Sequence, residues 1–245
     1  MPRYKLTVEY DGSEFVGWQW QANGYSVQQA LEEAVAAFSG EAVRVHGAGR
    51  TDAGVHAVAQ ACHLDLAGAP APDTLRDALN AYLRPRRVSV LAAETVADDF
   101  DARRSATARI YRYRIVNRRA PLALDVKRAW QISRELDADA MARAAKRLLG
   151  RHDFSSFRAS ACQAPSPIKT LDAFEVIRRA EEIHLTARSE SFLHHQMRAM
   201  VGSLVWVGER RWPEAHIDDV LAARDRRRAG PNAPPWGLYL EAVLY

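Results

Sequence analysis

The first forty residues show two clear periodicities. Apolar residues alternate with polar ones over positions 3–10, the period of two that is typical of a half-buried strand: Tyr4, Leu6, Val8 and Tyr10. Ser26 and Gln29 have the spacing of a capping box, and apolar residues then recur at helical spacing up to position 38. Gly40 supplies a stop signal. This pattern predicts a strand followed by an amphipathic helix that packs on a sheet.

The same signals continue through the first hundred residues. We expect strands near 42–46, 57–66 and 87–96, and a helix near 73–81 opened by Asp73. Together with the first strand and helix, these elements give a β-α-β-β-α-β order, which is typical of a ferredoxin-like unit. Residues 1–100 are therefore predicted to form an N-terminal ferredoxin-like half.

Residues 101–245 are predicted to form a C-terminal α+β half of similar build. The polar, arginine-rich stretch 97–108 reads as a connection between the halves. Strands are expected near 110–116, 127–132, 171–178, 182–189 and 237–244, helices near 137–148, 192–208 and 216–225, and long loops at 151–170 and 226–236. An apolar stripe along the helix from Phe192 is assigned to core packing. No residue-level repeat relates the halves.

Composition narrows the class of protein. The chain has 245 residues, 48% hydrophobic and 26% charged, an ordinary balance for a globular protein of one large or two small domains. No apolar run approaches the roughly 20 residues of a membrane span, and the N-terminus lacks a signal-peptide pattern. We therefore expect a cytoplasmic protein that does not bind membranes.

No metal site is expected. Cys62 and Cys162 belong to no CxxC pair or zinc-type cluster, so both are expected to be reduced and structural. His194 and His195 are adjacent, and neighbours on a helix point about 100° apart, which disfavours chelation by the pair.

Positive charge is concentrated in one segment, which we call the arginine belt, residues 101–119. It contains seven arginines against Asp101 alone, a local balance of +6 in a chain whose net charge is +4: Arg103, Arg104, Arg109, Arg112, Arg114, Arg118 and Arg119. Such a segment suits a polyanion. Compositional bias explains why arginine replaces lysine in this chain, but not where the charge lies.

The segment 46–56, His-Gly-Ala-Gly-Arg-Thr-Asp-Ala-Gly-Val-His, is the most unusual local sequence. Its three glycines permit positive φ, but the spacing fits neither a dinucleotide-binding nor a Walker phosphate loop. Taken alone, Asp52 would more often be a turn residue than a nucleophile. Arg50 and Asp52 stand two apart, so in an extended segment both side chains project to one side and can pair. A neighbouring guanidinium favours an ionised, nucleophilic carboxylate.

The chain resembles the tRNA pseudouridine synthase A family. The segment 47–57 is similar to that family's catalytic signature. Further similar motifs follow in order along nearly the whole chain: Tyr10-Asp11-Gly12-Ser13, Gly17-Trp18-Gln19, Ala102-Arg103 with Ser105 to Tyr113, Asp153 to Arg158, Phe192 to Arg198 with Val201-Gly202, and Gly237 to Leu240. Asp101 and Ala199 depart from residues common in the family, which bears on RNA contacts rather than on the reaction.

The resemblance implies a function and a set of roles. The enzyme would isomerise uridine to pseudouridine in the anticodon stem-loop of tRNA, as a homodimer and without a cofactor. Asp52 would attack the nucleotide and Arg50 would hold Asp52. Tyr111 would lie against the uracil and Leu238 would line the pocket, with Arg158 and Arg198 as candidate RNA contacts. The fold implied is α+β, two ferredoxin-like halves with mainly antiparallel sheets joined into one extended sheet with a central RNA-binding cleft.

An alternative of another class is a non-catalytic RNA-binding module. In that interpretation the arginine belt clamps RNA, the glycine-rich loop is structural, and a ferredoxin-like sheet stacks bases on its aromatics. The chain lacks an aromatic-rich strand of the RNP type, which disfavours this alternative. For Tyr111, the competing interpretation is ordinary core packing.

Overall fold

The computed structural model describes all 245 residues, which form two compact units. The first unit comprises residues 1–107 and 239–245, and the second comprises residues 108–238. The division thus falls after Thr107 rather than after residue 100. The last strand belongs with the first unit because it pairs in parallel with a strand there, Tyr239 opposite His56.

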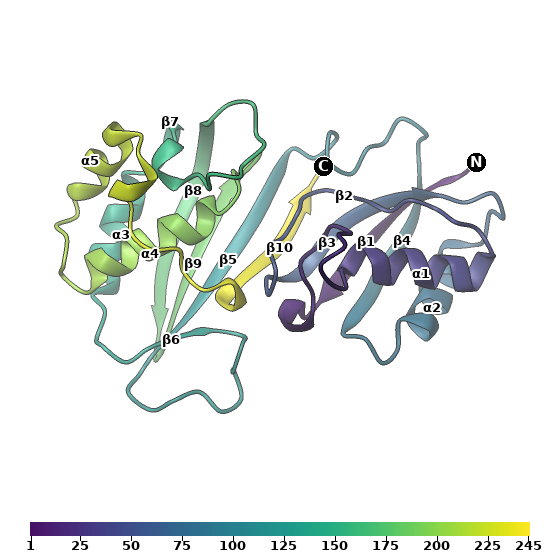
Figure 1. Cartoon of the computed structure of the whole chain (residues 1–245), viewed down its shortest axis with the longest axis horizontal. Helices are drawn as coiled ribbons and strands as arrows, with labels where there is room; N and C mark the ends of the chain where they lie inside the picture. The colour runs from purple at the N-terminus through teal and green to yellow at the C-terminus, as the bar shows by residue number, and fades with distance from the viewer. The chain divides into compact units, whose positions relative to one another are not determined.

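The first unit is a sheet with two helices on one of its faces (Figure 1). Its elements are β1 (Arg3–Tyr10), η1 (Gly12–Glu14), α1 (Val27–Ser39), β2 (His46–Gly47), β3 (His56–Asp65), α2 (Pro72–Leu83), β4 (Val88–Val96) and β10 (Leu238–Leu244). The strand order is β4-β1-β3-β10, with β2 also paired to β3. The pairs of β1 with β3 and β4 are antiparallel, as is that of β2 with β3. The predicted β-α-β-β-α-β order is confirmed.

Local sequence explains the best-predicted elements of this unit. The alternating apolar residues of β1 are all buried, in agreement with the period of two. Ser26 caps α1 by accepting a hydrogen bond from the Gln29 amide at 3.1 Å, and Gly40 ends the helix in the left-handed conformation. Helix α2 begins differently from the prediction. The helix begins at Pro72, which suits a first turn because it has no amide hydrogen to satisfy, and Asp73 therefore lies inside the helix and does not cap it.

The second unit is also a mainly antiparallel sheet with helices. Its elements are β5 (Ala108–Asn117), β6 (Trp130–Ile132), α3 (Ala138–Lys146), β7 (Gly150–Asp153), η2 (Ser155–Phe157), β8 (Ile168–Arg179), β9 (Glu182–Ser189), α4 (Gln196–Gly208), α5 (His216–Ala223), η3 (Arg226–Arg228) and η4 (Pro235–Gly237). The order is β5-β9-β8-β7, with β6 parallel to β5. The α+β class with mainly antiparallel sheets is confirmed. None of the helices combines the length and hydropathy of a membrane span.

Several predicted boundaries in the chain were wrong: the strand expected at 127–132 covers only the three residues of β6, and three further differences are larger. The strand expected at 42–46 shrinks to the two residues of β2, because side chains of α1 bind the backbone of Val45: its amide donates to Glu32 and its carbonyl accepts from Gln28. Helix α4 starts four residues later than expected, since His195 has a positive φ of 65°. The loop expected at 151–170 contains most of β7 and all of η2. The apolar stripe of α4 is buried, as predicted.

Candidate active site

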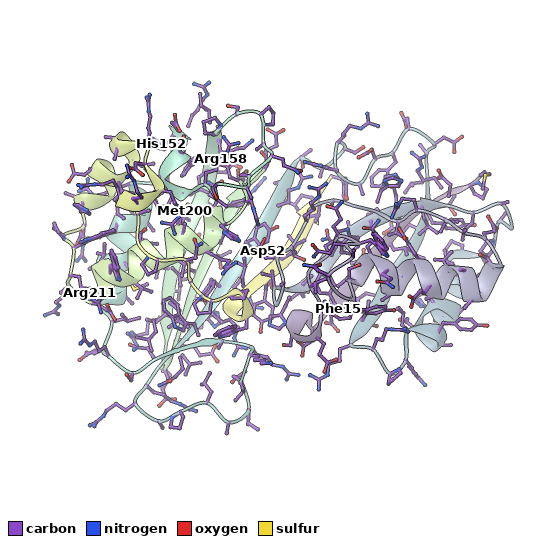
Figure 2. All side chains as sticks on the ribbon, viewed as in Figure 1. Phe15, Asp52, His152, Arg158, Met200 and Arg211 are labelled. Atoms are coloured by element: carbon purple, nitrogen blue, oxygen red, sulfur yellow. The ribbon has the colours of Figure 1, made fainter.

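Asp52 lies in the loop between β2 and β3 of the first unit, residues 48–55, which we call the Asp52 loop (Figure 2). The Asp52 side chain is half-buried and Arg50 is exposed, whereas Ala48, Thr51 and Val55 are buried. The loop is therefore anchored by buried residues, and its two charged residues are the less buried Arg50 and Asp52. The pairing of Arg50 with Asp52 stays a prediction.

The three glycines of the segment were predicted to permit positive φ, and one of them uses this freedom. Only Gly54, with φ of 77°, adopts the left-handed region. Outside the segment, Gly17 is required twice over. Its φ is 116°, and a Cβ there would lie 2.5 Å from the Thr51 carbonyl oxygen. Only glycine therefore lets the chain approach the Asp52 loop this closely at position 17.

The segment that follows β1 runs along the Asp52 loop and is bonded to it. The Trp18 amide donates to the Thr51 carbonyl at 3.0 Å, and Gly17 forms an isolated antiparallel bridge with Asp52. The Gly54 amide donates to the carbonyl of Phe15 at 3.4 Å. Backbone bonds thus hold the loop on both sides of Asp52. Gly17 and Trp18 belong to a motif that the family resemblance left without a role, and here they form the contact with the Asp52 loop.

Two side chains of β1 and β3 add further support. The hydroxyl of Tyr10 lies 2.8 Å from the hydroxyl of Thr51, and both groups are buried. Gln60 of β3 donates from Nε2 to the Gly49 carbonyl at 2.8 Å. Sequence reasoning missed Gln60 altogether. The available signal was a long polar side chain in the middle of a largely apolar strand.

His56 is a structural residue of this region. It is buried, and its Nδ1 accepts a hydrogen bond from the Gly12 amide at 3.0 Å. Nδ1 also lies 3.3 Å from a carboxylate oxygen of Asp11, but its lone pair is already used by Gly12. We therefore assign a neutral ring with the proton on Nε2. The ring stacks on Tyr239 with centroids 4.7 Å apart.

Asp11 anchors the same corner. Its carboxylate accepts from the Ser13 amide at 3.1 Å and from Arg87 at 3.0 Å. Burial alone would raise the pKa of Asp11, but the hydrogen bonds from Ser13 and Arg87 outweigh burial and lower the pKa to about 2. The carboxylate is thus ionised at neutral pH and ties η1 to the residue before β4.

Tyr111 lies in the second unit, on β5. Its ring is half-buried and meets Phe192 edge to face, with centroids 5.0 Å apart. Tyr113, two residues on, is a core residue instead: it is fully buried, and its hydroxyl donates to the Pro234 carbonyl at 2.7 Å. Burial raises the pKa of Tyr113. Of these two tyrosines, Tyr111 is the one with surface left for a ligand.

The other candidate residues of the second unit make structural contacts. Leu238 is buried. Arg198 donates from Nε to the Ala233 carbonyl at 2.8 Å, and Arg158 donates to the carbonyls of Cys162 and Ala164 at 2.8 and 2.7 Å. Both arginines are half-buried (Figure 2 labels Arg158). Each holds a loop in place, so any contact with RNA must come from the nitrogens that remain.

The arginine belt is not one continuous cationic surface. Arg109 is buried and donates to the Glu190 carbonyl at 2.6 Å. Arg114 pairs with Asp125 and Glu182 at 3.2 and 2.9 Å, and its hydrogen bond helps lower the pKa of Glu182 to about 2. Arg104 and Arg118 pair with Asp101 and Glu181. The local charge of +6 counted Asp101 but not Asp125, Glu181 and Glu182, and it ignored the carbonyl that Arg109 meets on folding.

The chain matches known proteins over its full length. The family described as "tRNA pseudouridine synthase" matches residues 6–103 and 144–245. The chain is 60% identical to the tRNA pseudouridine synthase A of Azorhizobium caulinodans, over 100% of this chain and 95% of that protein. It is 59% identical to that of Rhodopseudomonas palustris strain BisA53 and 56% identical to that of Parvibaculum lavamentivorans, over 100% of each chain. The family match includes Arg50 and Asp52, whereas Tyr111 lies between its two segments.

Proposed function

The chain belongs to the tRNA pseudouridine synthase family, and we propose that it isomerises uridines of the tRNA anticodon stem-loop with the Asp52 carboxylate as nucleophile. Isomerisation of tRNA uridine follows from the family. The identity of the nucleophile and the stem-loop target are our proposals. The observation that carries the proposal is the support of Asp52 by bonds at Thr51 and Gly54, with its carboxylate left half-buried rather than sequestered.

The reaction needs a nucleophile but no redox partner. The N1–C1′ bond of uridine breaks, the uracil turns, a C5–C1′ bond forms, C5 loses its proton to solvent and N1 takes up a proton. Electrons and atoms balance without a cofactor. A carboxylate at Asp52 can hold the fragments through a covalent adduct with either the sugar or the base. Backbone bonds at Thr51 and Gly54 fix the position of this nucleophile, which suits it to the role.

The remaining residues are proposed to bind the flipped nucleotide. Removing the uridine from its stack costs a few kcal/mol, which an aromatic surface can offset. The half-buried ring of Tyr111 offers such a surface. Leu238 would supply an apolar wall, and Arg50 would hold Asp52. Arg158 and Arg198 would contact RNA with the nitrogens not used for loop carbonyls.

We further propose a homodimer that acts in the cytoplasm, where its tRNA substrate is found. A single chain of 27.4 kDa is small beside a tRNA, so two subunits would grip it better. The alternative of a non-catalytic RNA-binding module loses its basis, because the chain belongs to a family of enzymes.

Tritium release from tRNA labelled at uridine C5 tests the proposal, since pseudouridine formation expels this hydrogen and binding does not. We expect Asp52→Asn to abolish release while the melting temperature and tRNA affinity stay close to those of the parent chain. Loss of an essential nucleophile commonly costs on the order of 10⁴-fold or more in turnover, whereas loss of a turn residue scales activity only with the folded fraction. A folded Asp52→Asn variant that kept more than about a tenth of the rate would exclude the proposed nucleophile.

A further inference from the structure

Gln60 is buried in a way that hydrophobic packing does not explain. Its side chain has no exposed surface, and its Nε2 donates to the Gly49 carbonyl at 2.8 Å. Its Oε1 is buried without any hydrogen-bond partner. A buried, unsatisfied amide oxygen costs on the order of 1–3 kcal/mol, so a leucine or methionine would serve packing at this position better.

The orientation of this amide follows from chemistry. A backbone carbonyl can only accept, so the group that faces Gly49 must be the NH₂ and the group left without a partner must be the oxygen. The useful part of the Gln60 side chain is therefore its donor. The orphaned oxygen is a cost of placing that donor there.

The position of Gly49 gives this donor its significance. The Asp52 loop leaves β2 at Ala48, whose amide donates to the Ala61 carbonyl at 2.8 Å. Bonds from Tyr10 and Trp18 reach the loop again at Thr51. Between these anchors, Gln60 holds the carbonyl of Gly49, three residues before Asp52. Gln60 itself lies in β3, where it pairs opposite Val8 of β1, so its Cα is fixed by the centre of the sheet.

We propose that Gln60 is a positioning residue that sets the course of the Asp52 loop through Gly49 and so places the Asp52 carboxylate. The inference rests on the proposed function of Asp52 as nucleophile. A displacement of about 1 Å in a reacting group can cost about 100-fold in rate. Gln60 does not touch the nucleotide in this proposal. Its loss changes the rate of the chemical step, not the affinity for tRNA.

Gln60→Met removes the donor and the orphaned oxygen while keeping the side-chain length. We expect the rate constant of single-turnover tritium release to fall about 10- to 100-fold. The tRNA dissociation constant and KM should stay within about twofold of the parent values. Stability should change little, since the lost hydrogen bond and the removed orphan oxygen have opposite effects.

Asn80→Leu is the matched control. The Asn80 amide of α2 donates to the Val90 carbonyl at 2.9 Å and accepts from the Val90 amide at 2.8 Å. It thus binds β4, which β1 separates from β3. This variant should lose stability and keep the parental single-turnover rate.

Gln60→Glu supplies a rescue. A carboxyl buried at this position is expected to stay protonated at neutral pH, and its O–H can then donate to Gly49. We expect a faster reaction than that of Gln60→Met, with a rate that declines as the pH is raised and the carboxyl ionises. If this variant does not fold, Gln60→Met alone decides the question.

The outcomes separate this inference from the proposed function. A folded Gln60→Met variant with the parental single-turnover rate would overturn the positioning role, while the proposed function would stand. An equal loss of rate in Asn80→Leu would also overturn the positioning role, because destabilisation of the fold alone would then explain the slower reaction. A fully active Asp52→Asn variant would instead overturn the proposed function.

Discussion

The hydroxyl groups of Tyr10 and Thr51 lie 2.8 Å apart in the buried interior of the first unit, although the residues are 41 positions apart in the chain. Tyr10 ends β1, and Thr51 immediately precedes Asp52. This single bond ties the first strand of the fold to the backbone that carries the candidate nucleophile. The end of β1 therefore helps to hold the Asp52 loop, in addition to its place in the core of the first unit.

Tyr10→Phe should therefore weaken both the fold and the reaction. The variant leaves the Thr51 hydroxyl buried without this partner, so we expect a loss of about 1 kcal/mol in the free energy of unfolding and a several-fold lower kcat. Urea unfolding and single-turnover tritium release measure the two effects. Adding Thr51→Val removes the orphaned hydroxyl, so the double variant should be about as stable as Tyr10→Phe alone. Fully additive losses would show that the two hydroxyls are not coupled.

Gly17→Ala should damage the Asp52 loop specifically. The new methyl group would lie 2.5 Å from the Thr51 carbonyl oxygen at a φ of 116°, so the loop or the segment must move. We expect a loss of more than about 2 kcal/mol in stability and a large loss of kcat in the fraction that folds. Gly40→Ala is the control, because Gly40 also has a positive φ, 74°, but nothing lies within 4 Å of its Cβ position. It should cost about 1 kcal/mol and leave kcat unchanged.

The parts of the fold that sequence predicted are those with local causes. The alternation of β1 and the caps Ser26 and Gly40 of α1 act within a few residues, so their outcome can be read from the chain. The missing strand at 42–46 has a long-range cause: Glu32 and Gln28 of α1 satisfy the backbone of Val45, which removes the need for a strand partner there.

The same distinction applies to the candidate site. The motif around Asp52 can be recognised in the sequence because it needs particular side chains. The residues that hold the Asp52 loop can be recognised only in part. Gln60, for example, binds a backbone carbonyl, which any residue at position 49 would present. The positive charge of the arginine belt was overestimated for a related reason. The carboxylates that neutralise Arg114 and Arg118, Glu182 and Glu181, come from another strand and its turn.

Stability should fall in acid through Asp11. Its pKa is about 2 in the folded chain and 3.8 in the unfolded one, so the folded state is favoured while Asp11 is ionised. This contribution, on the order of 2 kcal/mol, is present above about pH 4 and is lost as the pH falls from about 4 to about 2. Urea unfolding from pH 6 to pH 2 measures it. In Asp11→Asn the same part of the pH dependence should disappear, and an unchanged slope in this variant would assign the effect to other carboxyls.

The exposed arginines of the belt, rather than its buried ones, should contact phosphates. Arg103 and Arg119 are exposed, whereas Arg109 is buried. Replacing Arg103 or Arg119 by Ala should lower the salt slope of tRNA binding by roughly 0.7–0.9 each if each contacts one phosphate. Arg109→Ala should lower the melting temperature and leave the slope unchanged. If the double variant of Arg103 and Arg119 kept the parental salt dependence of tRNA binding, these arginines would be solvated and would not contact phosphates.

Tyr111 should act through its ring. Tyr111→Ala removes the surface proposed for the uracil, and base stacking on an aromatic ring contributes about 1–3 kcal/mol, so single-turnover tritium release should fall roughly 5- to 150-fold. Tyr111→Phe keeps the ring and its edge-to-face contact with Phe192. Any further loss of rate in Tyr111→Phe measures the hydroxyl, whose use in proton transfer would be worth about 10²- to 10⁴-fold. Tyr113→Phe is the control, since it breaks a buried bond to Pro234 and should cost about 1 kcal/mol of stability without slowing the reaction. Parental turnover in Tyr111→Ala would reduce Tyr111 to a packing residue, because a ring that only packs against Phe192 has no means to affect the rate except through stability.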